Sequence, residues 1–333
     1  MPRLSHALLL AAFGASIVSA QPSLDPPAGP IGESGRFGTL IELSQASAPG
    51  DADSVFKITQ PGSYILTGDI NVNAGEIGIE LASDDITLDL NGFTVRGNSL
   101  SGTVGIGVTP AEEGTSIISN VVIRNGSIRG VREGLLLDDL FFNFGLTNST
   151  AELARVDGIT IVDCGFGIEA DGAEISNCSI RVTSEGIDNP TGSVSACDVL
   201  ILGTINAAFG VRVSDGHVTD TRVEIRSGVP DSVEAFIVNS SVVRGCTALT
   251  RGNFSTGFAF GEQGATVTDC VAKRLSGSNT IGFNGDGVIA NCTAVAYFIG
   301  FASNDGVIRG CAAIDCTTDQ DVAGGVILRD NNF

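Results

Sequence analysis

The chain has 333 residues, and its 38 acidic side chains outnumber 18 basic ones, which gives a formal net charge of −20 at pH 7. A protein this acidic is not expected to bind nucleic acid or anionic lipid through charge. Hydrophobic residues make up 43% of the chain, alongside 44 glycines and no tryptophan. The composition therefore predicts a large folded core and excludes a nucleic-acid-binding protein.

The N-terminus has the pattern of an export signal. Arg3 precedes the apolar run Ala7–Val18, and small residues end at Ala20, which predicts a cleaved signal peptide over residues 1–20. Cleavage would remove one basic and no acidic residue, leaving 17 basic against 38 acidic side chains, a charge of −21. No later stretch is long and apolar enough to insert into a membrane. We therefore expect a secreted, periplasmic or cell-surface protein.

The next residues form a segment rich in Pro, Gly, Ser and Ala that predicts a linker over 21–55. A single repetitive domain is predicted over residues 56–333. In the second half of this domain, a turn residue recurs at intervals of 19, 24, 25, 24, 22 and 19 residues. The residue after each turn is expected to point into the core. The seven turn positions are Asn177, Ala196, Asp220, Gly245, Asp269, Asn291 and Gly310, and six of the following residues are cysteines. Asn, Asp and Gly tolerate a left-handed backbone, so each repeat predicts strand, one-residue bend, strand.

A second repeat, glycine followed by an apolar residue, runs from Gly78-Ile79 to Gly325-Val326. In three coils the apolar residue of this repeat is phenylalanine: Phe258, Phe283 and Phe301. In those coils the strand after the bend has alanine. A narrow core keeps a constant packing density when large residues face small ones. Three short strands per repeat of about twenty residues predict an all-β fold, a right-handed parallel β-helix solenoid of roughly ten coils. Two neighbouring segments resemble the bend, Asp157-Gly158 and Asp163-Cys164. Only the first would leave coils of full length on both sides of it.

The stacked cysteines are predicted to act as small hydrophobic residues. A disulfide between neighbouring coils, for example Cys246 with Cys270, stays an alternative because the coil spacing allows it. A zinc site is disfavoured because an in-register column does not converge on a tetrahedron. No metal site is therefore predicted in this column.

The segments Ile58–Leu66 and Ile86–Gly92 resemble the opening of exported bacterial right-handed β-helix repeat proteins of the pectate-lyase-like superfamily. Val267–Cys270 and Val307–Cys311 fit the same group, and the resemblance covers roughly residues 56–333. It implies the fold, while the superfamily includes lyases, hydrolases, esterases, epimerases and non-enzymatic surface proteins. The Trp-Ile-Asp-His motif of the lyases is absent, and Gly216-His217 lacks the Arg-Ile-Lys that follows in polygalacturonases.

The resemblance implies that catalytic groups would stand outward on the Gly-apolar strand. Among those positions, Glu169, Asp188 and Arg212 fall in consecutive coils and form the candidate catalytic set. Two carboxylates at strand spacing raise the pKa of one, while an arginine stabilises the other as an anion, which is how an acid/base pair is built. The alternative is a surface ladder of ion pairs without catalysis.

Three further residues are candidate binding groups: Asp171 on the same face, and Asp138 and Phe142 in the longest insertion. The insertion would form a wall beside the strip. His217 is expected to be a solvated corner residue. Asp-Gly pairs mark a further set of turns, which we call the Asp-Gly corners: Asp171-Gly172, Asp215-Gly216, Asp286-Gly287 and Asp305-Gly306. No cofactor is required, although Ca²⁺ is a candidate at the strip or at these corners.

The sequence thus favours an exported β-helix protein with a binding or structural role, because the scaffold is complete and no catalytic motif is. The alternative is a polysaccharide-active lyase, hydrolase or epimerase using the strip. A polysaccharide is the expected partner in either case. End-to-end self-association is also expected, since no capping helix is apparent beyond Asn331.

Overall fold

The computed structural model describes residues 39–98, 100–108, 116–138, 149–203, 208–226, 233–261 and 264–332. Every regular element in these ranges is a β-strand. Thirty-two of the strands belong to one hydrogen-bonded sheet, while β9 (Ser116–Ser119) and β12 (Ser149–Glu152) pair only with each other. None of these described segments forms a helix that is long and apolar enough to span a membrane.

The main sheet consists of three ladders, each made of strands that recur once per coil. The Gly-apolar ladder comprises β2 (Ser54–Ile58), β5 (Ile77–Leu81), β8 (Val104–Val108), β11 (Glu133–Leu136), β14 (Phe166–Glu169), β17 (Ile187–Asp188), β20 (Phe209–Val213), β23 (Val233–Val238), β26 (Ser255–Phe260), β29 (Ile281–Asn284) and the first parts of β32 (Ile299–Arg309) and β34 (Thr318–Arg329).

The pre-bend ladder comprises β1 (Leu40–Glu42), β3 (Gly62–Ile65), β6 (Ile86–Asp89), the first parts of β10 (Val122–Arg129) and β13 (Arg155–Cys164), β15 (Glu174–Ser176), β18 (Ser193–Ser195), β21 (His217–Thr219), β24 (Val242–Arg244), β27 (Ala265–Thr268), β30 (Gly287–Ala290) and the later parts of β32 and β34. The post-bend ladder comprises β4 (Ile70–Val72), β7 (Thr94–Gly97), the later parts of β10 and β13, β16 (Ser179–Val182), β19 (Asp198–Ile201), β22 (Arg222–Arg226), β25 (Thr247–Arg251), β28 (Val271–Ser276), β31 (Thr293–Val295) and β33 (Ala312–Ile314).

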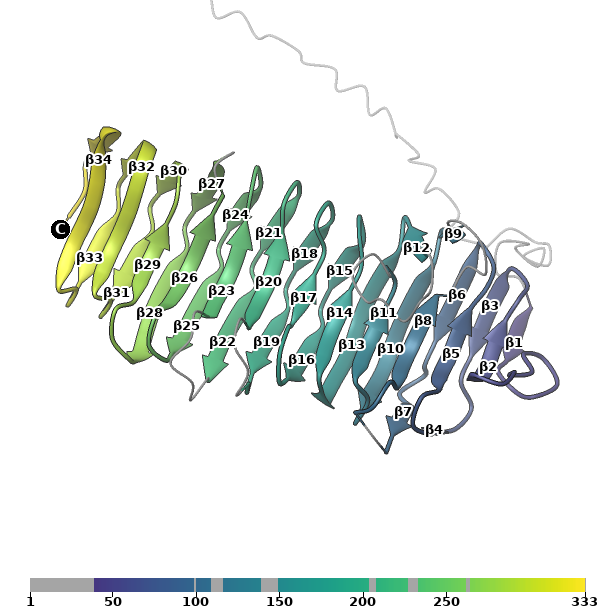
Figure 1. Ribbon diagram of the computed structural model, residues 1–333. Coiled ribbons are helices and arrows are strands. Elements are labelled where there is room, and N and C mark those ends of the chain that lie inside the picture. Colours follow the sequence, from purple (N-terminus) through teal and green to yellow (C-terminus); the bar gives the residue numbers. More distant parts are fainter. Residues whose placement is uncertain are drawn as a thin grey trace, which may run out of the picture. The chain divides into compact units, whose positions relative to one another are not determined.

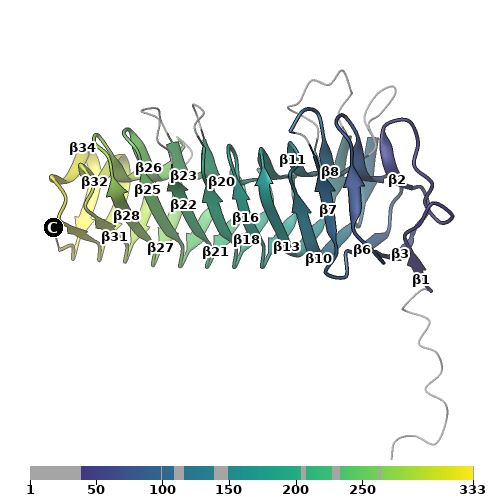
Figure 2. The ribbon, with the colours of Figure 1, turned by 90° about the horizontal axis from the view of Figure 1, so that it is seen from below.

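The prediction of a parallel β-helix is confirmed. Each strand pairs in parallel with its counterpart one coil away, as Ile168 with Ile187 and Ile187 with Val211 illustrate. Figure 1 shows the strands of successive coils side by side from β1 to β34, and Figure 2 shows the same order from below. In-register parallel pairing places equivalent side chains of neighbouring coils on top of one another.

The predicted bends are also confirmed. Each of the seven turn positions has a positive φ, and this includes Ala196 at +51°, where the residue type gave no signal. The residue after each bend is buried, and all six cysteines at this position are at most 3% exposed. Asp157 pairs with Ser176, so Gly158 lies in the bend column above Asn177, as the coil lengths predicted.

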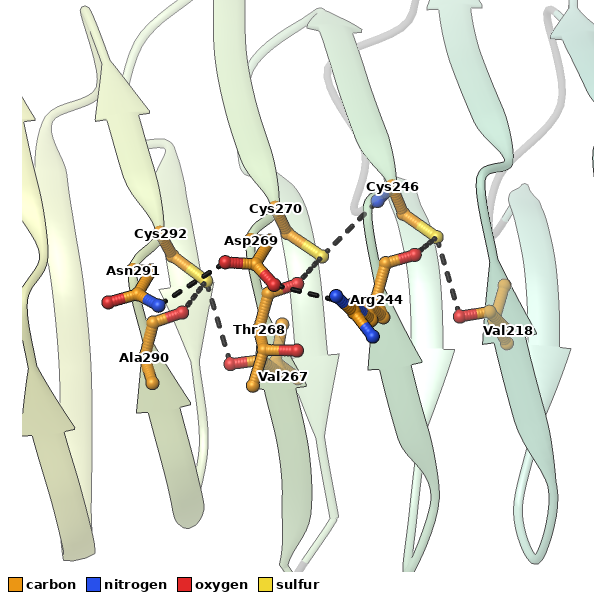
Figure 3. Close-up of polar contacts among 10 residues, drawn as sticks. All are labelled: Val218, Arg244, Cys246, Val267, Thr268, Asp269, Cys270, Ala290, Asn291 and Cys292. Atoms are coloured by element: carbon orange, nitrogen blue, oxygen red, sulfur yellow. Dashed lines mark hydrogen bonds and ion pairs between the residues drawn. The ribbon is translucent and has the colours of Figure 1, made fainter. Parts of the chain in front are cut away.

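All eight cysteines are free thiols. Figure 3 shows the column at Cys246, Cys270 and Cys292, where each thiol donates to the backbone carbonyl two residues earlier, as from Cys270 to Thr268 at 3.1 Å. The contact with the Cys270 thiol and burial together raise the pKa of Cys246. These sulfurs therefore act as packing groups, as predicted.

A column of stacked phenylalanines fills the C-terminal part of the core. Phe258 lies between Phe236 and Phe283, with ring centroids 4.6 and 4.9 Å away and nearly parallel planes. The opposite positions are buried alanines, and a Cβ on Gly282 would lie 2.9 Å from the Cβ of Ala294. Large residues on one ladder therefore require small ones on the other.

The two ends of the domain differ from the sequence prediction. Phe301 pairs with Gln320, and Gly325-Val326 falls instead beside Asp305-Gly306, so Ile327 is not an outward position of the Gly-apolar ladder. The prediction failed there because the last coil carries the polar residue Gln320 at the position where the other coils have an apolar residue. At the other end, β1 pairs with β3 and β2 begins at Ser54, so residues assigned to the linker contribute to the first coil.

Truncating a stacked phenylalanine should be far more costly than truncating an exposed one. We expect Phe258→Ala to lower the free energy of unfolding by about 3–5 kcal/mol, because it leaves a cavity between two rings. Phe298→Ala is the control, since Phe298 is 41% exposed and its loss should change stability by about 0.5 kcal/mol or less. Urea unfolding followed by circular dichroism measures both, and equal losses would contradict the column as the main packing element.

Candidate functional site

Glu169, Asp188 and Arg212 occupy the predicted positions on three neighbouring strands. Glu169 pairs with Asp188 and Asp188 with Arg212, so β14, β17 and β20 present the three side chains in one outward row. Although the row faces outward, Asp188 is only 6% exposed. We call this row the acidic strip. Its register was predictable from the glycine repeat, whereas its burial was not.

Arg212 is held on two sides. Its Nε donates to Asp188 Oδ1 at 2.8 Å, and a second nitrogen contacts Asp188 Oδ2. Its guanidinium carbon also lies 4.4 Å from the ring centroid of Phe209. A bidentate carboxylate pair combined with a cation–π contact fixes the guanidinium plane. The hydrogen bond with Asp188 is the main cause that raises the pKa of Arg212, and the charge of Glu169 adds a smaller contribution.

Glu169 has the electrostatic character of a protonated acid. Burial raises its pKa to about 9, and the negative charges of Glu133, Asp188, Asp138 and Glu185 add to the shift. Its Oε1 is buried, and no described residue forms a hydrogen bond with it. At neutral pH a neutral Glu169 thus lies beside an ionised Asp188–Arg212 pair. Chemically this row can supply one proton and one fixed carboxylate.

The predicted binding residues are divided between the strip and a corner. Asp138 is 3% exposed and contributes charge near Glu169. Asp171 accepts hydrogen bonds from the backbone and the hydroxyl of Thr191, at 3.1 and 2.6 Å, and so stabilises a corner. Phe142 lies outside the described residues, as does the proposed signal peptide.

The corner between the Gly-apolar and pre-bend ladders contains two adjoining hollows, of about 350 and 410 Å³. We call them together the corner groove. The first is lined by Gly172, Ala173, Glu174, Thr191, Gly192, Ser193, Asp215, Gly216 and His217, and the second by Ser240, Ser241, Val242, Gly264, Ala265, Thr266, Gly287 and Val288.

The groove follows the stacking direction of the coils. His217 in the first hollow is the register partner of Val242 in the second, and Val242 pairs in turn with Thr266. Close backbone packing requires glycine along it, because a Cβ on Gly216 would lie 1.9 Å from the carbonyl oxygen of Gly192. The Asp-Gly pairs in the sequence signalled these tight turns, but nothing in the sequence indicated a hollow.

His217 is exposed, as expected for a solvated corner residue, and it lines the groove. A further acidic cluster that sequence reasoning missed lies in the first coils. Oxygens of Asp51, Asp53 and Glu80 are within 4.8 Å of one another. Asp51 and Asp53 are close in the sequence, and the register of β2 with β5 brings the distant Glu80 beside them.

No protein-family model matches the chain, and no curated protein matches its sequence. Among solved structures, an alginate lyase from Paenibacillus sp. str. FPU-7 is 12% identical, with a TM-score of 0.40 over 88% of this chain and 99% of the lyase. A variant of the periplasmic alginate epimerase AlgG is 6% identical, with a TM-score of 0.41 over 88% and 83% of the two chains.

The Streptococcus pneumoniae surface protein and adhesin PfbA is 10% identical, with a TM-score of 0.26 over 88% of each chain. These similarities are too loose to transfer an activity or a binding residue to this protein.

Ionisation of Glu169 should make folding stability depend on pH. The folded-state pKa of about 9 lies above the ordinary value of 4.5. Between these values the unfolded chain has released a proton that the folded chain still holds, so the contribution of Glu169 to stability falls as pH rises from about 4.5 to 9. We expect Glu169→Gln to flatten this decline in unfolding free energy, measured by urea unfolding at several pH values.

The control is Glu152→Gln, which removes an exposed carboxylate from the same acidic protein and should leave the pH profile unchanged. Identical profiles for the wild type and Glu169→Gln would contradict a protonated Glu169.

Proposed function

We propose that this protein is an exported, non-catalytic β-helix protein that binds an extended, uncharged polysaccharide in the corner groove. The observation that carries the proposal is the pair of adjoining hollows along the stacking direction. Successive coils repeat about every 4.8 Å, close to the length of one sugar unit in an extended chain. A polymer lying along the groove would meet an equivalent set of groups at each coil.

The chemistry of the groove supports a neutral polysaccharide. All described residues that line the second hollow are uncharged, and the hydroxyl of Thr266 lies there beside the apolar surfaces of Val242 and Val288. Hydroxyls suit the equatorial groups of sugars, and valines suit their C–H faces. The first hollow carries Glu174 and Asp215, and the whole chain has a net charge of −20. A uronic-acid polymer would therefore be repelled.

A bulky side chain in the groove should abolish binding. Val242 is 42% exposed within the second hollow, so Val242→Trp should block it without disturbing the core. Val271 is 38% exposed on β28 of the post-bend ladder, which makes Val271→Trp a matched control. We expect at least a tenfold loss of affinity in the first variant and none in the second, measured by isothermal titration with soluble xylans, β-glucans and mannans.

Polygalacturonate and alginate serve as anionic comparison ligands and should bind more weakly than the neutral polymers. Preferential binding of the anionic polymers, or equal binding by Val242→Trp and wild type, would refute the corner groove as the site.

A second candidate function is polysaccharide cleavage or epimerisation on the acidic strip. It is favoured by one observation, the neutral Glu169 beside the ionised Asp188–Arg212 pair. For hydrolysis, Glu169 would protonate the glycosidic oxygen as its bond to the anomeric carbon breaks, a water would add to that carbon and pass its proton to Asp188, and Arg212 would hold the Asp188 carboxylate in place. The protonated acid would remain available up to a pH of about 9.

Catalysis on the strip predicts turnover that depends on Glu169. Incubation with uronic-acid and neutral glycans, with and without Ca²⁺, should release reducing ends or unsaturated products, and Glu169→Gln should reduce the rate by at least a hundredfold. Arg212→Ala should also reduce it. Val242→Trp controls for simple loss of groove binding. Absence of turnover across the panel would exclude this second function and leave the first intact.

A further inference from the structure

The strongest unassigned feature is the acidic cluster of the first coils. Asp51 and Asp53 lie in the turn before β2, and Glu80 stands on β5, where it is the register partner of Lys57. One oxygen from each carboxylate lies within 4.8 Å of the others. Two oxygens bound to one Ca²⁺ ion can be separated by up to twice the bond length of about 2.4 Å. The three groups can therefore reach a common ion.

Glu80 distinguishes this cluster from ordinary surface acids. It is 1% exposed, and its Oε2 is buried without a hydrogen-bond partner among the residues that the structure describes. Leaving a carboxylate oxygen buried and without a partner costs free energy. A cation bound at this oxygen would remove that cost. The buried oxygen thus supports a cation site independently of the number of acids nearby.

Lys57 neutralises the cluster only in part. Its ammonium lies 2.9 Å from Asp51 Oδ2 and 2.8 Å from Glu80 Oε1, so it serves one oxygen of each. No ion pair is recorded for Asp53 among the described residues, and one ammonium among three carboxylates leaves a local charge of about −2. The Lys57 side chain is 27% exposed, so its ammonium can turn toward solvent when a stronger cation arrives.

We propose that Asp51, Asp53 and Glu80 form a binding site for Ca²⁺ that joins the turn before β2 to strand β5. Calcium accepts six to eight oxygen ligands in flexible geometry, so carboxylates from a turn and a strand can be completed by water. Mg²⁺ binds at about 2.0–2.1 Å in a strict octahedron, which a set spread over 4.8 Å suits less well.

The test is a calcium titration of the whole protein, monitored by isothermal calorimetry and by thermal unfolding against EGTA. We expect saturable binding of one Ca²⁺ per chain and a rise in Tm of a few degrees with millimolar Ca²⁺. Mg²⁺ should bind at least tenfold more weakly.

Variants separate this site from non-specific attraction to an acidic protein. Glu80→Gln and Asp53→Asn should each weaken Ca²⁺ binding at least tenfold, and Asp53 is exposed, so its replacement leaves the core intact if Glu80→Gln fails to fold. Lys57→Met should tighten binding, because it removes the competing ammonium. Asp198→Asn is the control, since it removes a 60% exposed carboxylate paired with Arg222 elsewhere.

No response of the wild-type Tm to Ca²⁺ would overturn the proposal. So would an undiminished response in Asp53→Asn, which would indicate diffuse surface binding.

Discussion

In-register hydrogen bonding between parallel coils is the constraint on which every other feature of this structure depends. Because each backbone strand pairs with the strand one repeat away, at about 4.8 Å, every side chain lies directly on its own counterpart. The residue type at one position of a coil must therefore be compatible with the residues at the equivalent positions of the two neighbouring coils. The phenylalanine column from Phe236 to Phe301 satisfies the rule by face-to-face stacking, with centroids at most 5.1 Å apart. The cysteine column satisfies it with small, polarisable thiols that donate to their own strand.

The same constraint is severe for charges, since stacked carboxylates repel. On the outward faces a carboxylate is paired with arginine in one of two ways, either within its own strand or with the next coil. Glu224 is 5% exposed and pairs with Arg226 and Arg222, and these contacts lower its pKa despite burial. Asp188 is likewise paired, with Arg212 one coil away. Among the described residues Glu169 forms no ion pair, and its burial, together with the charges of neighbouring acids, raises its pKa. The raised pKa of Glu169 is therefore caused first by its burial and second by the neighbouring acids, and it exists whether or not the strip is catalytic.

Sequence patterns predicted those parts of the molecule in which residue type and backbone conformation coincide. The bends were predictable because Asn, Asp and Gly tolerate positive φ, and even Ala196 was placed correctly because its neighbours kept the period. The row from Glu169 to Arg212 followed from the glycine repeat. Prediction failed where the residue at a ladder position is atypical, as with Gln320 in place of an apolar residue. It also missed properties that belong to no single repeat: the burial of Asp188, the corner groove, and the approach of Glu80 to Asp51 across two strands.

The corner groove and the acidic strip would use ligands in different ways. Close approach between coils imposes glycine at the groove, as at Gly216 and at Gly287, whose Cβ would lie 2.2 Å from the carbonyl oxygen of Ala265. A surface made of small residues is shallow and offers no deep pocket, so no single contact can supply much affinity. Binding there must accumulate over several coils, which selects long polymers over short ones and makes affinity grow with ligand length. The strip concentrates its chemistry in three neighbouring residues, so any activity there would depend on one sugar unit. Dependence on ligand length thus separates the two functions on physical grounds: it is steep for the groove and weak for the strip.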